Sequence, residues 1–333
     1  KTNTARRIAI FGAPAKVAVG GGGSSNVSAT ETDTALDEIT KRSRGAKVSY
    51  SSGLNHLSAA QEAKKADVAI VFVTNLTMEA MDRTSINLLS EQTALINKVA
   101  SANKNTIVVL NTGGPIAMPW LPKVAAVLNM WQPGQAGGKA TASLLYGDVN
   151  PSGHLPQTFP TADGQWPAHT LAQFPGGPLG LTPTYSEGIF VGYRWYQSRN
   201  QVPLFPFGYG LSYTTFAYSV PRMQATSGAA NTPIKVTFTV TNTGKRAGAT
   251  VPQVYVGKPR NQGVSVPPKE LGGFQKVYLR PGESKTITIT VLPQQLSYWN
   301  SNLHKFVVMP GVYHIYLGSN VNETSYTLNY TVR

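Results

Sequence analysis

The first half of the chain alternates short apolar runs with amphipathic stretches. The apolar runs predict strands at residues 7–11, 47–50, 68–73, 106–111 and 124–130, and the amphipathic stretches predict helices at 33–41, 57–65, 91–102 and 138–145. Strands separated by helices of this length form a parallel sheet covered on both faces. We therefore predict an open, mainly parallel α/β sandwich over residues 1–160.

The pattern changes after Thr232, where the helical periodicity disappears. Residues 234–240 and 285–291 alternate strictly between apolar and polar side chains, and further strands are predicted at 252–256, 270–278, 311–317 and 325–332. About seven short strands separated by turn residues are typical of a β-sandwich of the immunoglobulin or fibronectin type III kind. We predict this all-β domain over residues 223–333.

The segment between these two regions is rich in proline, glycine and aromatic residues. Its densest parts are residues 185–196 and 203–213. Aromatic rings bury much area while tyrosine hydroxyls still find hydrogen-bond partners. We predict that residues 161–222 form a linker that packs on both domains.

Composition narrows the class of protein. Hydrophobic residues make up 41% and charged residues 13% of the chain, and no apolar run is long enough to span a membrane, which indicates a soluble globular protein. The net charge of +14 raises the question of a polyanionic partner, but the 29 Lys and Arg are scattered along the chain, so we expect neither a nucleic acid nor a membrane partner. Cysteine is absent, which excludes disulfides and thiolate metal sites.

No cofactor or metal ion is expected. The histidines lack the spacing of metal ligands. The glycine run at residues 20–23 lacks the Lys and Ser/Thr that follow the glycines of a phosphate loop. A flexible loop that lets the backbone approach a ligand or a neighbouring domain is the better interpretation.

Glu79 is the first candidate for chemistry. It follows the strongly apolar strand at 68–73, and open α/β sheets bind their ligands just beyond the carboxyl ends of such strands. The alternative, that Glu79 caps the following helix or lies in solvent, stays open on the residues alone.

An ordered set of motifs then identifies a family. The set comprises residues 7–12 with the loop 20–25, then residues 79–83, 105–113, 118–121, 133–135, 145–153, 187–194 and 207–213. It resembles the C-terminal two-thirds or so of a family 3 glycoside hydrolase, the β-glucosidase and β-xylosidase family, without the N-terminal (β/α)8 barrel. The resemblance covers essentially the whole chain.

The resemblance implies a retaining glycosidase with three domains: a barrel, an α/β sandwich and a fibronectin-like domain. The barrel carries the nucleophilic Asp and is missing here, whereas the acid/base carboxylate matches Glu79. Partial burial against Met78 and Met81 is expected to raise the pKa of Glu79. The family glycine after the catalytic Glu is Ala80 here, and a glutamate usual after Pro-Gly-Gln is Ala136.

Other residues complete the expected site. We expect Gly22, Gly23, Ser24 and Trp131 to contact the sugar, with Trp120 as a further stacking candidate. Asp82 and Arg83 are expected to form an ion pair that holds the loop near the site. Glu187 is the next candidate for the acid/base if Glu79 is structural.

Two functions remain open. The first is the non-barrel portion of an exo-acting, β-glucosidase-like enzyme, whose partners are a barrel domain or chain and a β-linked glucoside or oligosaccharide. The second is a non-catalytic carbohydrate-binding or scaffold module derived from that family. Glycosylation sequons at Asn26, Asn75, Asn322 and Asn329 are compatible with a secreted protein, and the start at Lys1 suggests a processed fragment.

Overall fold

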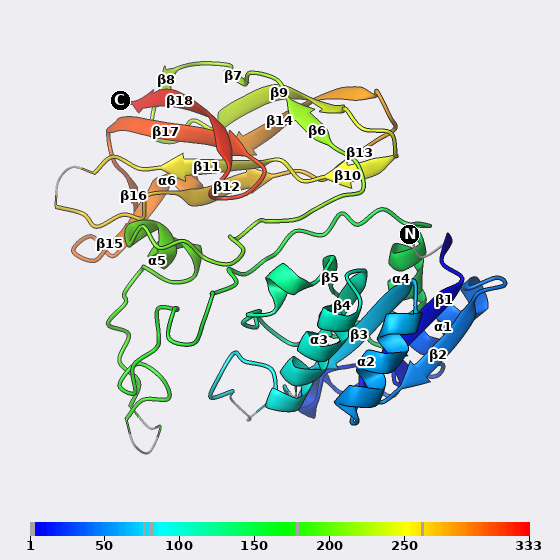
Figure 1. Ribbon diagram of the computed structural model, residues 1–333. Helices are drawn as coiled ribbons and strands as arrows, with labels where there is room; N and C mark the ends of the chain where they lie inside the picture. Colours follow the sequence, from blue (N-terminus) through cyan, green and yellow to red (C-terminus); the bar gives the residue numbers. More distant parts are fainter. Residues whose placement is uncertain (1–3, 76, 80–82, 178–179, 181, 261–262) are drawn as a thin grey trace. The chain divides into compact units, whose positions relative to one another are not determined.

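The computed structural model describes residues 4–75, 77–79, 83–177, 180, 182–260 and 263–333. The chain divides into two compact units (Figure 1). The first unit comprises residues 1–149 and 161–163, and the second unit comprises residues 150–160 and 164–333. Residues 161–222, for which the sequence predicts a linker, therefore lie almost wholly in the second unit.

The first unit is built on a five-stranded sheet in the order β2-β1-β3-β4-β5. Its strands are β1 (Arg7–Phe11), β2 (Lys47–Ser51), β3 (Val68–Thr74), β4 (Thr106–Asn111) and β5 (Ala126–Asn129). Every neighbouring pair is parallel, as the sequence predicts. The strand order reverses between β1 and β3, and a crevice beyond the carboxyl ends of the strands is expected at such a point.

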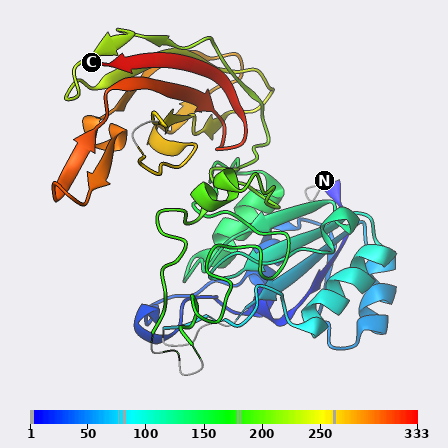
Figure 2. The ribbon, with the colours of Figure 1, turned by 90° about the vertical axis from the view of Figure 1, so that its left-hand side faces the viewer.

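Helices cover both faces of this sheet (Figures 1 and 2). They are α1 (Ala35–Arg42), α2 (His56–Lys65), α3 (Ser90–Ala102) and α4 (Gly137–Tyr146), with short 3-10 turns η2 (Ala13–Lys16), η3 (Gly23–Ser25) and η4 (Leu121–Lys123). Helix α1 packs against α4, and α2 packs against α3. Side-chain caps explain where two of them begin, because Thr34 accepts a hydrogen bond from the Asp37 amide and Asn55 accepts one from the Ser58 amide.

The core of the first unit lies where the central strand β3 is covered on both faces. Residues 68–73 are all buried, which is why this strand is a continuous apolar run rather than an alternating one. Ile10, Ile70 and Val109 lie in the same cluster and are fully buried. The sheet is therefore a rigid platform for the loops at its carboxyl edge.

The second unit is mostly antiparallel β-structure. One sheet has the order β12-β11-β17-β18-β8 and another β14-β9-β6 with β7 beside β9, while β10-β13 and β15-β16 form two-stranded sheets. The strands are β6 (Phe216–Tyr218), β7 (Arg222–Met223), β8 (Ser227–Gly228), β9 (Ile234–Asn242), β10 (Gly248–Thr250), β11 (Gln253–Gly257), β12 (Glu270–Phe274), β13 (Val277–Leu279), β14 (Ser284–Val291), β15 (Ser297–Asn300), β16 (Lys305–Val308), β17 (Gly311–Gly318) and β18 (Thr324–Val332). Two short helices, α5 (Tyr193–Ser198) and α6 (Pro293–Leu296), accompany them.

One predicted strand is wrong in its extent. Residues 270–278 form two strands, because β12 pairs with β11 whereas β13 pairs with β10. Pro252 lies between β10 and β11 and cannot donate a backbone hydrogen bond, so the ladder breaks there. The opposite segment changes partner at the same level, where the Gln275 amide donates to the Pro252 carbonyl at 3.4 Å.

Candidate active site

Four loops meet at the carboxyl edge of the parallel sheet. The loop after β1 pairs with the loop after β3 through a backbone bridge between Gly22 and Met78. The loop after β5 joins them, because the Gln132 amide donates to the Thr77 hydroxyl at 2.6 Å. The loop after β4 is attached by a 3.1 Å bond from the Gly113 amide to Asn75 Oδ1. These contacts bring the loops after β1, β3, β4 and β5 together at one edge of the sheet.

Glu79 lies exposed at the surface of this loop cluster. Its Oε2 accepts hydrogen bonds from the Ser24 backbone amide at 3.2 Å and from the Ser24 hydroxyl. The Ser24 hydroxyl, followed by the Ser24 amide, holds the pKa of the Glu79 carboxyl below its ordinary value. The expected rise in pKa through burial is thus wrong for this chain by itself: Met78 is 38% exposed, and Met81 lies outside the described residues.

The glycines beside Glu79 are required by close backbone approach. A Cβ atom on Gly22 would lie 2.7 Å from the Met78 Cβ, and one on Gly23 would lie 2.9 Å from the Glu79 Cβ. Gly23 also has φ +63°, which residues with side chains rarely adopt. Gly22, Gly23 and Ser24 therefore hold the Met78–Glu79 segment in place. Their contact with a sugar stays a prediction.

Trp120 and Trp131 differ in solvent exposure. Trp120 is completely buried, so the expectation that it stacks on a sugar is wrong, and it serves the core instead. Trp131 is partly exposed and has φ 55°, an unusual backbone angle for a bulky residue. Its amide donates weakly to Asn129 Oδ1 at 3.4 Å. Sugar contact by Trp131 stays a prediction.

The segment that follows Glu79 is tied to its surroundings at several points. Arg83 Nη1 donates to the Pro115 carbonyl at 3.0 Å, and burial lowers the pKa of its guanidinium. Asp82 lies outside the described residues, so its pairing with Arg83 is untested. Sequence reasoning missed Asp163, whose carboxylate accepts from Ser85 Oγ, the Ile86 amide and Asn87 Nδ2 at 2.6 to 2.7 Å. No local motif could have found it, because this anchor is distant in sequence.

Glu187, the next candidate for the acid/base, belongs to the second unit. Its Oε2 accepts a 3.2 Å hydrogen bond from Gln173 Nε2.

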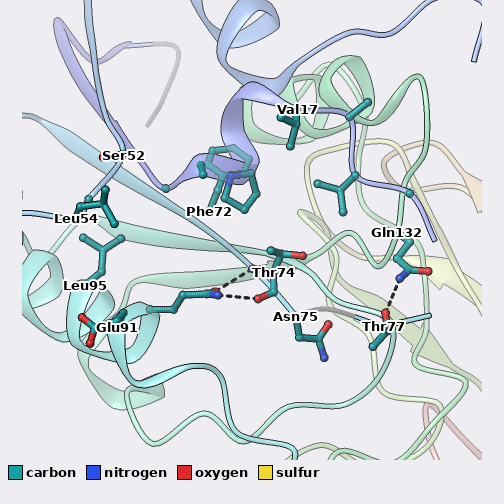
Figure 3. Close-up of a pocket in the computed structure, with 18 of the residues that line it drawn as sticks. Val17, Ser52, Leu54, Phe72, Thr74, Asn75, Thr77, Glu91, Leu95 and Gln132 are labelled. Atoms are coloured by element: carbon teal, nitrogen blue, oxygen red, sulfur yellow. Dashed lines mark hydrogen bonds between the residues drawn. The ribbon is translucent and has the colours of Figure 1, made fainter. Parts of the chain in front are cut away.

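A cleft of about 590 Å³ opens beside the loop cluster (Figure 3). It lies where the strand order reverses, since its wall includes residues that follow β1 and β3. Aliphatic side chains of Val17, Leu54 and Leu95 line much of it. Asn75 Nδ2 is buried at its wall and lacks a hydrogen-bond partner among the described residues. The cleft is thus mostly apolar, and the Asn75 side-chain amide is available at its wall to donate a hydrogen bond.

The described residues contain no group of three or more His, Cys, Asp or Glu side chains that could hold a metal ion. In the same part of the chain, none of the helices combines the length and the hydropathy that crossing a membrane requires.

Comparisons with known proteins agree with this architecture. Residues 2–213 match the model of the glycosyl hydrolase family 3 C-terminal domain, and residues 250–321 match a fibronectin type III-like domain. The thermostable beta-glucosidase B of Acetivibrio thermocellus is 40% identical over 94% of this chain and 43% of its own length. An exo-alpha-(1->6)-L-arabinopyranosidase of Bifidobacterium longum is 35% identical over 98% of this chain and 44% of its own length. The chain thus spans less than half the length of these relatives.

Solved structures give the same result. The beta-glucosidase DesR of Streptomyces venezuelae, solved in complex with D-glucose, superposes with a TM-score of 0.93 at 31% identity, covering 99% of this chain and 56% of that one. The beta-D-glucoside glucohydrolase of Trichoderma reesei superposes with a TM-score of 0.90 at 32% identity, covering 99% of this chain and 52% of that one.

Proposed function

The chain belongs to glycosyl hydrolase family 3, and from this premise we propose that it supplies the general acid/base carboxylate and one wall of the sugar site to a retaining, exo-acting β-glycosidase. The observation that carries the proposal is Glu79, an exposed carboxylate beyond the carboxyl end of β3, held by two hydrogen bonds from Ser24. A (β/α)8 barrel, as a domain or a separate chain, provides the nucleophile. The substrate is a β-linked glucoside or oligosaccharide.

Retention requires two carboxyl groups roughly 5 Å apart on either side of the glycosidic bond. In the first step the nucleophile attacks the anomeric carbon, the bond to the leaving oxygen breaks, and Glu79 gives that oxygen its proton. In the second step Glu79 takes a proton from water. The water oxygen then attacks the anomeric carbon and displaces the nucleophile.

The electrostatics of Glu79 support the second step more directly than the first. Ser24 stabilises the charged carboxylate and so lowers the pKa, which suits a base. Acting as an acid near neutral pH requires a raised pKa. We propose that a barrel covering this edge removes water from Glu79 and raises its pKa, so that the acid form belongs to the assembled enzyme.

Exposed apolar side chains at the same edge support a barrel partner. Leu54, Leu57 and Leu89 are 86%, 69% and 70% exposed, and Val17 at the cleft is 55% exposed. Apolar surface of this kind commonly marks an interaction site. Obligate interfaces commonly bury more than about 2,000 Å² in total, and we expect this edge to form part of one.

The alternative is a non-catalytic carbohydrate-binding or scaffold module. One observation favours it: the pKa of Glu79 in the chain is shifted away from that of a general acid. Purification from the natural source separates the two functions, because a barrel domain or chain present in the same molecule or complex supports the enzyme. A chain that purifies without a barrel supports the module.

A graft supplies a barrel for a direct test. This chain replaces the matching part of the Acetivibrio thermocellus beta-glucosidase B, and Glu79→Gln is introduced. Hydrolysis of glucosides with poor alkyl or sugar leaving groups is expected to fall about a hundredfold to ten-thousandfold, far more than that of activated aryl glucosides. Azide is expected to restore part of the turnover of Glu79→Ala, since it attacks without needing a base.

Glu31→Gln is the matched control for the graft, because Glu31 is exposed and lies in the same unit. It is expected to keep the activity of the parent graft on both substrate classes. Equal losses for both leaving groups in Glu79→Gln, without azide rescue, would mean that Glu79 is structural. Glu187 would then be tested in the same way.

The chain without a barrel is expected not to hydrolyse β-glucosides, because only one of the two carboxyl groups has a candidate here.

We also propose that the protein is secreted, on the basis of its sequons. Asn26, Asn322 and Asn329 are exposed, which supports them as glycan acceptors, whereas the buried Asn75 Nδ2 does not. Glycopeptide mass spectrometry of the protein from its natural source tests this: we expect glycans on Asn26, Asn322 or Asn329, and the absence of a glycan on all three would contradict the proposal.

A further inference from the structure

The positive charge of this protein is concentrated in the second unit. That unit holds 14 of the 29 Lys and Arg but only four of the 15 Asp and Glu, so it carries +10 of the net +14. The linear sequence hides this asymmetry, because its cations are spread over more than a hundred residues. An imbalance of this size creates a positive potential that attracts polyanions.

The four carboxylates of the second unit are already engaged. Glu270 lies 3.5 Å from Arg194 and 2.5 Å from Lys258. Glu187 accepts from Gln173, Glu283 accepts from the Arg280 amide, and Glu323 accepts from the Ser319 hydroxyl. The unit therefore holds ten more cations than carboxylates.

Strand β13 presents part of this charge on one face. Lys276, Tyr278 and Arg280 alternate with the buried Val277 and Leu279, so the three exposed side chains lie on the same side of the strand. Tyr278 is 65% exposed. Tyr278 lies within β13, and Lys276 and Arg280 flank the strand, so the aromatic ring has a cation two residues away on each side.

A second basic segment lies beside the end of β13. The Asn242 amide nitrogen donates to the Arg246 carbonyl at 2.8 Å and to the Leu279 carbonyl at 3.0 Å. This places the exposed Lys245 and Arg246 next to the end of β13. The Arg246 guanidinium also lies over the ring of Tyr213, 5.7 Å from its centroid.

We name the exposed side chains of β13 and of this neighbouring segment the β13 surface: Lys245, Arg246, Lys276, Tyr278 and Arg280, with Tyr213 beside Arg246. Four cations and two exposed tyrosine rings combine the two interactions that hold an acidic sugar polymer. The cations attract carboxylate groups, and the rings pack against the apolar faces of sugars.

We propose that the β13 surface binds an anionic polysaccharide carrying uronate groups. The β13 surface belongs to the second unit, whereas Glu79 belongs to the first, and this proposal does not depend on how the chain contributes to catalysis. A single-stranded nucleic acid also combines negative charge with stacking groups. Membership of a glycosyl hydrolase family favours the polysaccharide, and the nucleic acid becomes one outcome of the test.

The test measures binding of the full chain to polygalacturonate, with laminarin as a neutral glucan, by affinity electrophoresis and calorimetry. We expect binding to polygalacturonate alone, weakened at least about tenfold between 50 and 200 mM NaCl, because salt screens exposed charges. The double variant Lys276→Ser/Arg280→Ser is expected to weaken binding at least about tenfold. Tyr278→Ala is expected to weaken it several-fold with an unchanged salt dependence.

The matched control is Lys64→Ser/Lys65→Ser, which removes two exposed cations from α2 in the first unit. It changes the net charge by the same amount and is expected to leave the affinity within about twofold. An equal loss in both double variants would overturn the proposal, since the attraction would then be due to net charge alone. Stronger binding to poly(U) than to polygalacturonate at equal salt, lost in the same β13 variants, would overturn the choice of a sugar polymer.

Discussion

Ser24 is the residue that defines the state of Glu79. It reaches the same carboxylate oxygen through its hydroxyl and its backbone amide, so the charged form of Glu79 is stabilised twice. Sequence patterns do not predict this contact, because Ser24 and Glu79 are 55 residues apart and come together where Gly22 pairs with Met78. The position of Glu79 after a buried strand can be predicted from the sequence, whereas its contact with Ser24 depends on how the two loops fold.

Ser24→Ala is expected to raise the pKa of the Glu79 carboxyl in the isolated chain towards its ordinary value. The hydroxyl stabilises only the charged form, so its loss makes protonation easier and moves the titration to higher pH. Carbon-detected NMR titration of the Glu79 carboxyl measures this. Ser28→Ala, an exposed serine of the same loop region, is the control, and an unchanged pKa in Ser24→Ala would contradict the assignment.

Gly23→Ala is expected to destabilise the first unit by about 1 to 3 kcal/mol. Its φ of +63° and the 2.9 Å approach of a new Cβ to Glu79 both oppose a side chain. Gly20→Ala is the control, because nothing lies within 4 Å of a Cβ at that position. Urea unfolding of the two variants gives the comparison, and equal stabilities would remove the claim that close approach requires Gly23.

At the scale of elements, the sequence determines most of the first unit. The run at 68–73 could be placed as a central strand because burial on both faces demands continuous apolar residues. Helix α1 was expected to begin at residue 33 and begins at Ala35, after the Thr34 cap. Boundaries shift in this way because local capping, rather than periodicity, decides the first turn.

The second unit was harder to predict in detail. The long alternating strands β9 and β14 follow from their period of two. The hairpin of β15 and β16 and the short strand β10 were missed, because three or four residues carry too little pattern. The division of residues 270–278 between two sheets depends on Pro252, which lies between β10 and β11. The pattern of residues 270–278 therefore cannot predict it.

The side chain of Asn242, at the end of β9, connects this strand to the segments at β10 and β13. Its side chain is completely buried, donates to the carbonyls of Arg246 and Leu279, and accepts from the Thr214 hydroxyl at 2.7 Å. Asn242→Ala is expected to cost about 2 to 4 kcal/mol, because it leaves several buried polar groups without partners. Chemical denaturation measures the loss.

Asn231→Ala is the control for this prediction, since Asn231 is exposed in the same unit. A loss below about 1 kcal/mol in Asn242→Ala would mean that water replaces the amide and that the three strands are held by their ladders instead. If the larger loss is observed, Asn242 also becomes the residue that keeps Lys245 and Arg246 beside β13.

At the scale of the whole molecule, the two units differ in net charge. The first unit has an apolar cleft and exposed leucines at its sheet edge. The second unit also exposes leucines, such as Leu211 and Leu303, but it carries most of the net charge. The composition of the sequence gives only the net charge of the whole chain, and the Lys and Arg residues are scattered along it, so the difference between the two units appears only when the units are known. The two proposed partners therefore belong to different units: a protein at the sheet edge of the first unit and an anionic polysaccharide on the second.

The apolar edge leads to the last prediction, which concerns assembly. The N-terminal remainder of the Acetivibrio thermocellus beta-glucosidase B, produced separately, is mixed with this chain, and association is followed by size-exclusion chromatography. Leu54→Asp/Leu57→Asp is expected to weaken association at least about a hundredfold, because two charges would be buried in an apolar interface. Both leucines are largely exposed, so the variant is expected to fold normally.

Leu303→Asp, at a 56% exposed leucine of the second unit, is the control and should associate like the parent chain. Undiminished association of the double variant would place the barrel on another face, and the exposed leucines would then need a different partner.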